Sequence, residues 1–517
     1  MGLIALALAM HVRRLWRSFE RTCAKPVESQ LAVLRGLLAR AAGTEWGRQF
    51  GFADIRTPRQ YRARVPVTDY EAAAASWHKA FDGAADVAWP GHVRYFAMSS
   101  GTTAAPGAPG AGNKYLPVTD DAIRCNIRAG GLLVAALAHR GGLRSITDGR
   151  VFYLGGSIAL TPRGKCLHGD ASGIVSRHIP SWVRGRSLPA EDIRRVANWQ
   201  EKIDLLVERY LTADDVCALG ACPSWAALLF KQMLQAVEAR GLPRRTIGEL
   251  WPKLRHFISY GMSFQPYRRA FQQYLGRDIH YTSTYSSSEA GMSAVQVEDG
   301  EPLRLIVDNG VFYEFIPAAR AAEANPPRLH IGEVSTGEDY AVLVSTNGGL
   351  WAYPLGDVVR FEGLIPPRIV FAGRTQLQLS AFGEHVTLGA IEKAVAAACE
   401  RTGATVADYT VAPRYPSPDS PIPAHRWIIE FDRPPADAAA FMAAADQSIR
   451  RENEDYDTHR TGDYGLLPPQ LVPVAPRTFY EWMKARGKLG GQNKVPRVAL
   501  SATMAEELLE ISGRLGG

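Results

Sequence analysis

A carboxylate beside hydroxyl groups is the first feature of this sequence that could do chemistry. Residues 285–289 read Tyr-Ser-Ser-Ser-Glu, follow the strand-like segment 279–284 and come shortly before Gly291. The side chain of Glu289 suits Mg²⁺ when phosphate oxygens fill the other coordination positions. A capped turn would explain the same run, so both interpretations stay open at this point.

A second run has the composition of a phosphate-binding loop. Residues 99–103 read Ser-Ser-Gly-Thr-Thr, follow the strand-like segment 93–97, and lead through glycines and prolines to Lys114. Small residues around glycine let backbone N–H groups approach a phosphate, and the hydroxyl groups add further donors. Lys114 could add a point charge. The alternative is an ordinary polar turn.

A third run could bind a sugar. Residues 353–357 read Tyr-Pro-Leu-Gly-Asp, which predicts a tight turn that delivers Asp357 just before the strand-like segment 358–361. An aspartate in such a place can accept both hydroxyl groups of a ribose. A hairpin turn that happens to contain an aspartate is the competing interpretation.

Lysine is scarce, and its distribution is uneven. Of the 59 Lys and Arg residues 11 are lysine, and Lys484, Lys488 and Lys494 fall close together in and beside the glycine-rich run 487–494. A flexible ammonium on such a loop suits transient stabilisation of phosphoryl charge better than the planar fork of arginine. A solvated loop would explain the cluster as well.

The elements that must position these runs alternate in type. Helical spacing of apolar residues marks 27–48 and 70–81, and short apolar strands at 93–97, 151–154 and 216–219 alternate with amphipathic stretches at 193–210 and 225–239. This alternation predicts an α/β fold.

The end of the chain has a different pattern. A strand at 368–372 leads into Gly373-Arg374, where we expect a hinge, and a helix at 388–399 and a strand at 426–431 follow. The pattern predicts a small α+β unit after the hinge.

Length and composition exclude several classes of protein. The chain has 517 residues, 46% hydrophobic and 21% charged, which allows about three domains and excludes disorder as the dominant state. The net charge of +7 is dispersed. It therefore argues against a nucleic-acid partner and fits an enzyme that handles anionic small molecules.

Cysteine usage and the first residues bear on location. The six cysteines form no Cys-x-x-Cys pair, so we expect neither a zinc site nor a disulfide framework, and a cytoplasmic protein. Residues 1–10 are apolar, but they lack a basic leader and are too short to span a bilayer. We interpret them as the start of a helix and expect no stable membrane insertion.

Familiar catalytic signatures are absent. The sequence contains no His-Glu-x-x-His, Gly-x-Ser-x-Gly, Gly-x-x-x-x-Gly-Lys-Ser/Thr or Gly-x-Gly-x-x-Gly motif. The sequence therefore disfavours several enzyme classes, namely zincins, serine hydrolases of the usual kind, P-loop NTPases and Rossmann dehydrogenases.

Taken in order, the motifs resemble those of the Gretchen Hagen family of acyl acid amido synthetases, within the adenylate-forming superfamily and including bacterial relatives. The family's Ser-Ser-Gly-Thr, Tyr-x-Ser-Ser-Glu, Tyr-x-x-Gly-Asp and Lys-x-Pro-Arg motifs are matched at 99–102, 285–289, 353–357 and 494–497. Further similarity lies at 37–52, 221–229 and 383–385. The likeness thus extends over almost the whole chain.

The resemblance implies a two-domain α/β enzyme. Residues 1–372 would form a large adenylate-forming domain with mixed sheets and helices, which holds ATP and the acid, and residues 373–517 a small α+β lid. A carboxylate would attack the α-phosphorus of ATP and expel pyrophosphate, and an amine, in most relatives an amino acid, would then capture the acyl adenylate. Positioning and charge neutralisation carry most of such a phosphoryl transfer.

The resemblance also implies a role for each matched residue. By this likeness Glu289 would hold Mg²⁺, and Lys494 would act at the reacting centre. Asp357 and Arg374 would contact the ribose. The residues implied in ATP binding are Ser99, Ser100, Gly101, Thr102, Thr103, Tyr285, Ser288, Asp357, Arg374, and, near the adenine, Gly261 and Met262.

The sequence departs from the family pattern in one loop, and two alternative functions stay open. The family has only a few residues between its Ser-Ser-Gly-Thr run and the next lysine, whereas here 104–113 intervene with two prolines that lack N–H donors. A ligase that forms a thioester shares the first half-reaction, and a non-catalytic nucleotide-binding homologue would keep only the binding residues.

We expect the helical lead-in and residues 160–182 to line the pocket for the acid.

Overall fold

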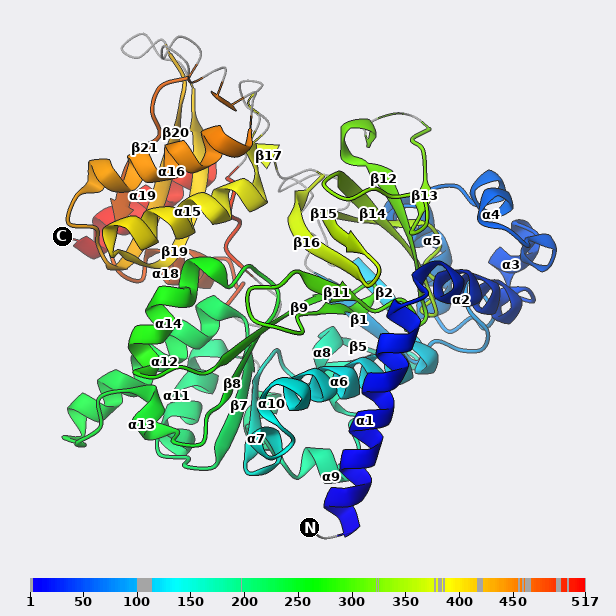
Figure 1. Cartoon of the computed structure of the whole chain (residues 1–517), viewed down its shortest axis with the longest axis horizontal. Helices are drawn as coiled ribbons and strands as arrows, with labels where there is room; N and C mark the ends of the chain where they lie inside the picture. Colours follow the sequence, from blue (N-terminus) through cyan, green and yellow to red (C-terminus); the bar gives the residue numbers. More distant parts are fainter. Residues whose placement is uncertain are drawn as a thin grey trace.

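The computed structural model describes most of the chain. The described residues are 3–99, 114–196, 198–321, 323, 325–375, 378–379, 384, 386–415, 422–453, 456–457, 460, 466–489, 494–499 and 502–516. Along the chain, a helical N-terminal segment is followed by a body built on a large mixed sheet and by a C-terminal α+β unit (Figure 1).

The N-terminal segment is helical, as its apolar spacing predicts. Its helices are α1 (Leu3–Cys23), α2 (Pro26–Ala41), α3 (Glu45–Gln49), α4 (Pro58–Arg64) and α5 (Tyr70–Phe81), with a 3₁₀ turn η1 (Phe52–Asp54). Local capping sets their starts, because Thr44, Thr57 and Asp69 each accept a backbone N–H of the first helical turn. Helix α1 runs beside α6, and its first residues lie at the bottom of the view in Figure 1.

A 12-stranded sheet runs through the body, in the order β13-β12-β14-β15-β16-β11-β10-β9-β8-β7-β3-β6. Its strands are β3 (Arg150–Leu154), β6 (Ser187–Leu188), β7 (Val216–Ala221), β8 (His256–Ser259), β9 (His280–Ser287), β10 (Gly291–Val295), β11 (Leu303–Leu305), β12 (Val311–Pro317), β13 (Leu329–His330), β14 (Asp339–Thr346), β15 (Tyr353–Leu364) and β16 (Pro367–Arg374). The strands from β6 to β9 are parallel, and those from β9 to β13 are antiparallel.

Helices and a second sheet complete the body. The second sheet has the order β2-β1-β5-β4 and contains β1 (Tyr95–Ser99), β2 (Lys114–Val118), β4 (Thr161–Arg163) and β5 (Cys166–Gly169). The helices are α6 (Asp120–Gly141), α7 (Arg144–Thr147), α8 (Ala171–Ser176), α9 (Ser181–Arg184), α10 (Glu191–Arg195), α11 (Trp199–Tyr210), α12 (Pro223–Ala239), α13 (Ile247–Leu250) and α14 (Arg268–Leu275), with η2 (Gln265–Tyr267) and η3 (Ala318–Arg320).

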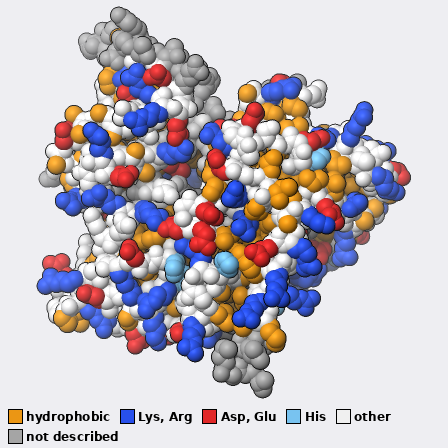
Figure 2. Space-filling view, viewed as in Figure 1, with side chains coloured by type: hydrophobic (Ala, Val, Ile, Leu, Met, Phe, Trp, Pro, Cys, Tyr) orange, Lys and Arg blue, Asp and Glu red, His pale blue; other side chains and the backbone are white. Residues whose placement is uncertain are grey.

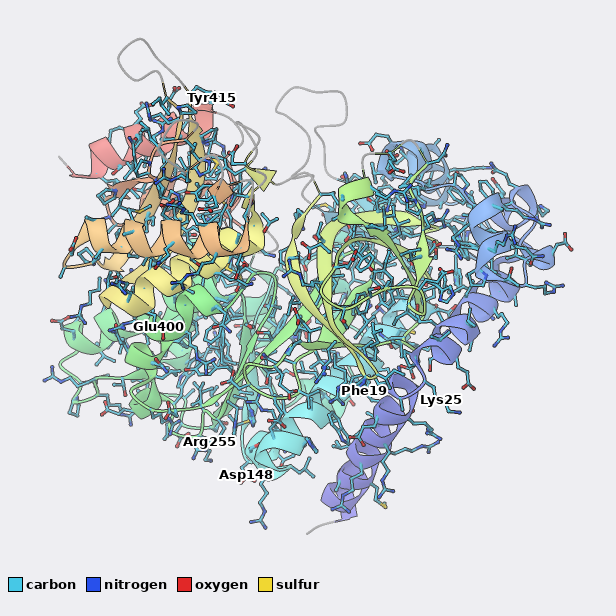
Figure 3. All side chains as sticks on the ribbon, turned by 45° about the horizontal axis from the view of Figure 1, so that its top comes forward. Phe19, Lys25, Asp148, Arg255, Glu400 and Tyr415 are labelled. Atoms are coloured by element: carbon cyan, nitrogen blue, oxygen red, sulfur yellow. The ribbon has the colours of Figure 1, made fainter. Side chains whose placement is uncertain are left out.

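The C-terminal unit has its own sheet and its own core. Strands β19 (Thr405–Arg414), β20 (Ala424–Arg433) and β21 (Gln470–Val474) form a sheet in that order, and β17 (Gln378–Leu379) pairs with β18 (Val386–Thr387). Helices α15 (Leu388–Thr402), α16 (Ala438–Glu452), α18 (Thr478–Ala485) and α19 (Ala502–Gly516) pack on it. Figure 3 shows the end of α15, near Glu400, over the body helix α14.

The expected α/β organisation is confirmed, with two local differences. The stretch 193–210 is divided between α10 and α11, because Asn198 caps a new helix by accepting the N–H of Glu201 over 3.0 Å. The tight turn expected at 353–357 is wrong, since these residues already belong to β15 and the turn precedes them at 347–352.

The surface agrees with the dispersed charge of the sequence. On the face in Figure 2, Lys and Arg side chains are scattered and interspersed with Asp and Glu. Among the residues that the structure describes, none of the helices combines the length and the apolar character that a membrane span requires.

Candidate active site

The carboxylate of Asp357 lies between a neighbour on the next strand and a tyrosine from β9. Asp357 on β15 and Arg374 at the end of β16 are direct partners in the antiparallel ladder. Arg374 Nε lies 3.1 Å from Asp357 Oδ1, and Tyr285 donates its hydroxyl to Oδ2 over 2.7 Å. Oδ1 is buried and accepts no hydrogen bond of good geometry from the described residues. It therefore keeps acceptor capacity for a hydroxyl group of a ligand.

A bulge directs Asp357 to this place. The register between β14 and β15 shifts here, so residues 355–357 have no partner on β14. The carbonyl of Gly356 in the bulge accepts the backbone N–H of Thr375 over 2.9 Å, which joins the bulge to the residue just after β16. Bulges of this kind re-aim a side chain and are frequent beside active sites.

Glu289 lies in the turn that connects β9 and β10, together with Ser288. Gly291 follows at φ +65°, and a Cβ there would lie 2.1 Å from Asn126 Oδ1 on α6. Asn126 Oδ1 also accepts the N–H of Met292 over 3.3 Å, so the turn is fixed against α6. A residue other than glycine at 291 would push the turn and Glu289 away.

Lys494 enters the body from the C-terminal unit. Its ammonium donates a hydrogen bond to the carbonyl of Gly261, in the loop after β8. Gly261 has φ +83°, and a Cβ at this position would lie 2.6 Å from Lys494 Nζ. Glycine at 261 therefore leaves the room that the lysine occupies.

Arg497 is a buried contact between the C-terminal unit and the body. On its own side it pairs with Asp408 and donates to the carbonyl of Tyr409 over 2.8 Å. On the body side it donates to the hydroxyl of Tyr267 over 2.7 Å and to the sulfur of Met262 over 3.5 Å. The buried guanidinium thus joins the Lys-x-Pro-Arg segment to the loop that receives Lys494.

The expected phosphate loop is only partly described. Ser99 ends β1 and is paired with Lys114, which begins β2, so the two strands bring the ends of the loop together. Lys114 Nζ lies 5.4 Å from the centre of the Tyr70 ring. Ser100, Gly101, Thr102, Thr103 and the rest of the loop to 113 lie outside the described residues, as do Gly383 and His385.

Models of one protein family match three parts of the chain. The GH3 family N-terminal domain matches residues 15–157, the central domain 304–374 and the C-terminal domain 390–503, in all more than half of the sequence. The chain belongs to the GH3 family. The resemblance predicted from the four motifs is therefore confirmed.

Individual relatives of this GH3 family member include plant enzymes. A protein of Oryza sativa subsp. japonica named probable indole-3-acetic acid-amido synthetase GH3.12 is 25% identical over 449 residues, 70% of this chain and 71% of the relative. Jasmonoyl–L-amino acid synthetase JAR6 of Nicotiana attenuata is 33% identical over 168 residues, 30% of this chain and 28% of the relative.

The fold agrees with a solved structure of the family. The GH3.15 acyl acid amido synthetase superposes with a TM-score of 0.74 at 19% identity, covering 99% of this chain and 96% of the other. At this identity the match supports the fold, and the predicted fold class is confirmed.

Burial changes the pKa values of the ionisable groups in this GH3 site. Burial raises the pKa of the Asp357 carboxyl, an effect that Arg374 opposes. Burial also raises the pKa of Glu289, and Asp357 adds to that increase. Burial lowers the pKa of Lys494, Arg374 lowers it further, and Asp357 opposes the change. These mutual effects place two carboxylates and two cations in one electrostatic environment.

No role is predicted for Arg497, although this residue ends the matched Lys-x-Pro-Arg motif. Its partners Tyr267 and Asp408 belong to no motif, and only the fold brings them together. Asn126 was also missed. A glycine just after the Tyr-x-Ser-Ser-Glu run was the available signal that another side chain approaches the turn closely.

Proposed function

We propose that this GH3 family member uses ATP to activate a carboxylic acid as an acyl adenylate and then transfers the acyl group to the amine of an amino acid. The observation that carries the proposal is the convergence of Tyr285, Asp357, Arg374 and Lys494, from four separate segments, on one site. The two relatives described above are named as a probable indole-3-acetic acid-amido synthetase and as a jasmonoyl–L-amino acid synthetase.

The residues present fit ATP and Mg²⁺. The open acceptor on Asp357 Oδ1 suits a ribose hydroxyl, with Arg374 beside it. Glu289 would hold Mg²⁺ together with phosphate oxygens, because a single carboxylate supplies only part of the octahedral set of oxygen ligands that Mg²⁺ requires. When bound, Mg²⁺ would neutralise phosphate charge. The end of β1 at Ser99 would border the phosphates.

Lys494 would act on the reacting groups in the first step. An oxygen of the substrate carboxylate attacks the α-phosphorus, and the bond to the bridging oxygen breaks to release pyrophosphate. The ammonium of Lys494 stabilises the negative charge on the transferring group, as preorganised donors do in a site of low dielectric. In the second step the amine attacks the acyl carbon, AMP leaves, and the amine loses its proton.

Residues 373–517 would form a lid whose position selects the half-reaction. In the arrangement described here Lys494 is inserted beside Gly261, which suits adenylation. Withdrawal of the lid would remove Lys494 and admit the amine, so one site would serve two chemistries in turn.

Exchange of labelled pyrophosphate into ATP tests the proposal directly. Aryl and alkyl carboxylic acids are screened by trapping the activated acyl group with hydroxylamine, and the best acid is used for the exchange assay. We expect exchange that depends on the acid and on Mg²⁺, and amide products with amino acids. A thioester product with coenzyme A in place of the amide would favour the alternative ligase, and binding of ATP without exchange would favour the non-catalytic homologue.

A further inference from the structure

Helix α1 is attached to the body by one face. Phe19 and Cys23 are buried in one apolar cluster with residues of α6, and Trp16 stacks on His139 of α6 with ring centres 4.6 Å apart. Towards its start the described side chains are no longer buried, and Met10 is 58% exposed. The first turns of α1 project beyond α6 in Figures 1 and 3. The body therefore fixes α1 through the second half of the helix.

The outer face of α1 is strongly basic. Its exposed side chains form one stripe, because they recur every three or four residues. The members of this stripe are Met10, Arg13, Arg14, Arg17 and Arg21. Glu20 is the one acidic residue of α1, and none of the four arginines forms an ion pair with a described residue. In Figure 2 several basic side chains lie over this helix. The stripe thus offers positive charge to a partner.

The part of α1 that precedes the arginines is apolar. Residues 3–8 read Leu-Ile-Ala-Leu-Ala-Leu, and the exposed Met10 carries this apolar character into the stripe. A helix of this length rises about 9 Å, which matches the depth of about 5–10 Å that interfacial helices reach in a lipid surface. It is far shorter than the hydrocarbon core of about 30 Å. The segment therefore suits shallow insertion and no crossing.

Two other occupants fit this surface less well. A second copy of the chain, related by a twofold axis, would bring the same arginines together, and like charges that face each other disfavour association. A nucleic acid would pair with the arginines, but it would give the apolar start of α1 no partner. An anionic lipid surface satisfies both halves of the helix at once.

We propose that α1 docks the protein reversibly on an anionic phospholipid surface. The apolar start of the helix enters the headgroup region, and the arginines of the stripe lie against lipid phosphates, with which they form charge-assisted hydrogen bonds. Apolar burial and attraction to anionic lipid add in such an interaction. The inference goes beyond the proposed function and does not depend on it, because no residue of the candidate active site takes part.

Flotation with lipid vesicles tests the inference on the full chain. The vesicles consist of phosphatidylcholine, with or without phosphatidylglycerol, at low and at high salt. One variant combines Arg13→Gln, Arg14→Gln and Arg17→Gln, which removes charge from the stripe and keeps good helix formers. A second variant, Met10→Gln, removes an exposed apolar side chain and leaves the charge unchanged.

The matched control removes the same charge from other places. It combines Arg59→Gln, Arg240→Gln and Arg401→Gln, three exposed arginines outside α1 that form no ion pair with a described residue. The control and the stripe variant therefore have the same net charge. Thermal unfolding checks that every variant is folded, and a DNA duplex is tested as a competing anionic partner.

We expect the wild type to float with vesicles that contain phosphatidylglycerol and to be released by high salt. The stripe variant should bind them at least about tenfold more weakly, Met10→Gln about threefold more weakly, and the control as tightly as the wild type. A wild type that does not float, or a control that loses as much binding as the stripe variant, would overturn the inference. Tighter binding to the DNA duplex than to the vesicles, unchanged in Met10→Gln, would assign the stripe to nucleic acid instead.

Discussion

The carboxylate of Asp357 is the single group on which ATP binding should depend most. We expect Asp357→Asn to slow adenylation at least about tenfold, a loss of roughly 1.4 kcal/mol of transition-state stabilisation, because the amide keeps the shape but loses the charge that faces Arg374. The measurement is pyrophosphate exchange at saturating acid over a range of ATP concentrations.

Asp339→Asn is a suitable control for this prediction. Asp339 lies at the start of β14 and pairs with Arg360 over 2.8 Å, so it also contributes a carboxylate–arginine pair within the same sheet, outside the proposed site. Exchange at the wild-type rate in a correctly folded Asp357→Asn protein would remove this residue from the site.

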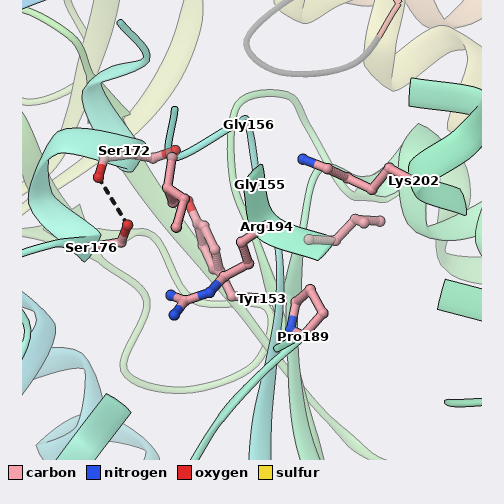
Figure 4. A pocket seen from close by; sticks show the side chains of 11 residues that line it. Tyr153, Gly155, Gly156, Ser172, Ser176, Pro189, Arg194 and Lys202 are labelled. Atoms are coloured by element: carbon pink, nitrogen blue, oxygen red, sulfur yellow. Dashed lines mark hydrogen bonds between the residues drawn. The ribbon is translucent and has the colours of Figure 1, made fainter. Parts of the chain in front are cut away.

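The buried lysine Lys202 (Figure 4) should affect the stability of the protein. Burial lowers the pKa of Lys202 to about 8, from its ordinary value of 10.5. Between these two values the unfolded state binds more protons, so this lysine makes stability rise with pH there, and its full penalty is present below about pH 8.

We therefore predict that Lys202→Met is more stable than the wild type at pH 7, by up to about 3 kcal/mol, and that the difference shrinks as the pH rises from about 8 to 10.5. Thermal unfolding across this range measures the effect, with Lys253→Met, which removes an exposed lysine, for comparison. A variant that is less stable at pH 7 would show that the ammonium has a stabilising partner.

At the scale of elements, the sequence predicted correctly those features that depend on neighbouring residues. Helix α5 begins and ends at the predicted residues, because Asp69 caps it and its apolar spacing is regular. The turn predicted at 353–357 was wrong, since proline and glycine in a run can mark a bulge as well as a turn, and only pairing with β14 and β16 decides between them. Contacts such as Arg497 with Tyr267 join segments 230 residues apart and leave no local pattern.

Arg497 fixes the segment 494–499, and with it Lys494, to the body. Arg497→Lys keeps a charge but cannot serve Asp408, Tyr409 and Tyr267 together, so we expect Lys494 to lose its fixed position. The rate of adenylation at saturating ATP should fall about tenfold with little change in ATP affinity. The rate of acyl transfer from preformed adenylate to the amine should change less. An equal loss in both half-reactions would indicate a structural role only.

At the scale of the whole molecule, polar contacts between described residues also join the C-terminal unit to the body outside the site. Asp432 on β20 forms an ion pair with Lys231 on α12 and accepts the hydroxyl of Tyr274 on α14 over 2.7 Å. The proposed withdrawal of the C-terminal unit requires that such contacts can break, because a ligand can shift a balance of only a few kcal/mol.

Under the proposed lid movement, Asp432→Ala should shift the C-terminal unit away from the position that inserts Lys494. We expect adenylation to slow about fivefold and amide formation from preformed adenylate to be unchanged, since the carboxylate touches neither substrate. Limited proteolysis between the body and the C-terminal unit should become faster in the variant, and addition of ATP with the acid should restore protection by favouring the inserted state. Lys393→Ala breaks a different ion pair, with Glu452 within the C-terminal unit, and should leave both rates and the proteolysis pattern as in the wild type. Faster proteolysis with unchanged adenylation would show that lid position does not limit the first step.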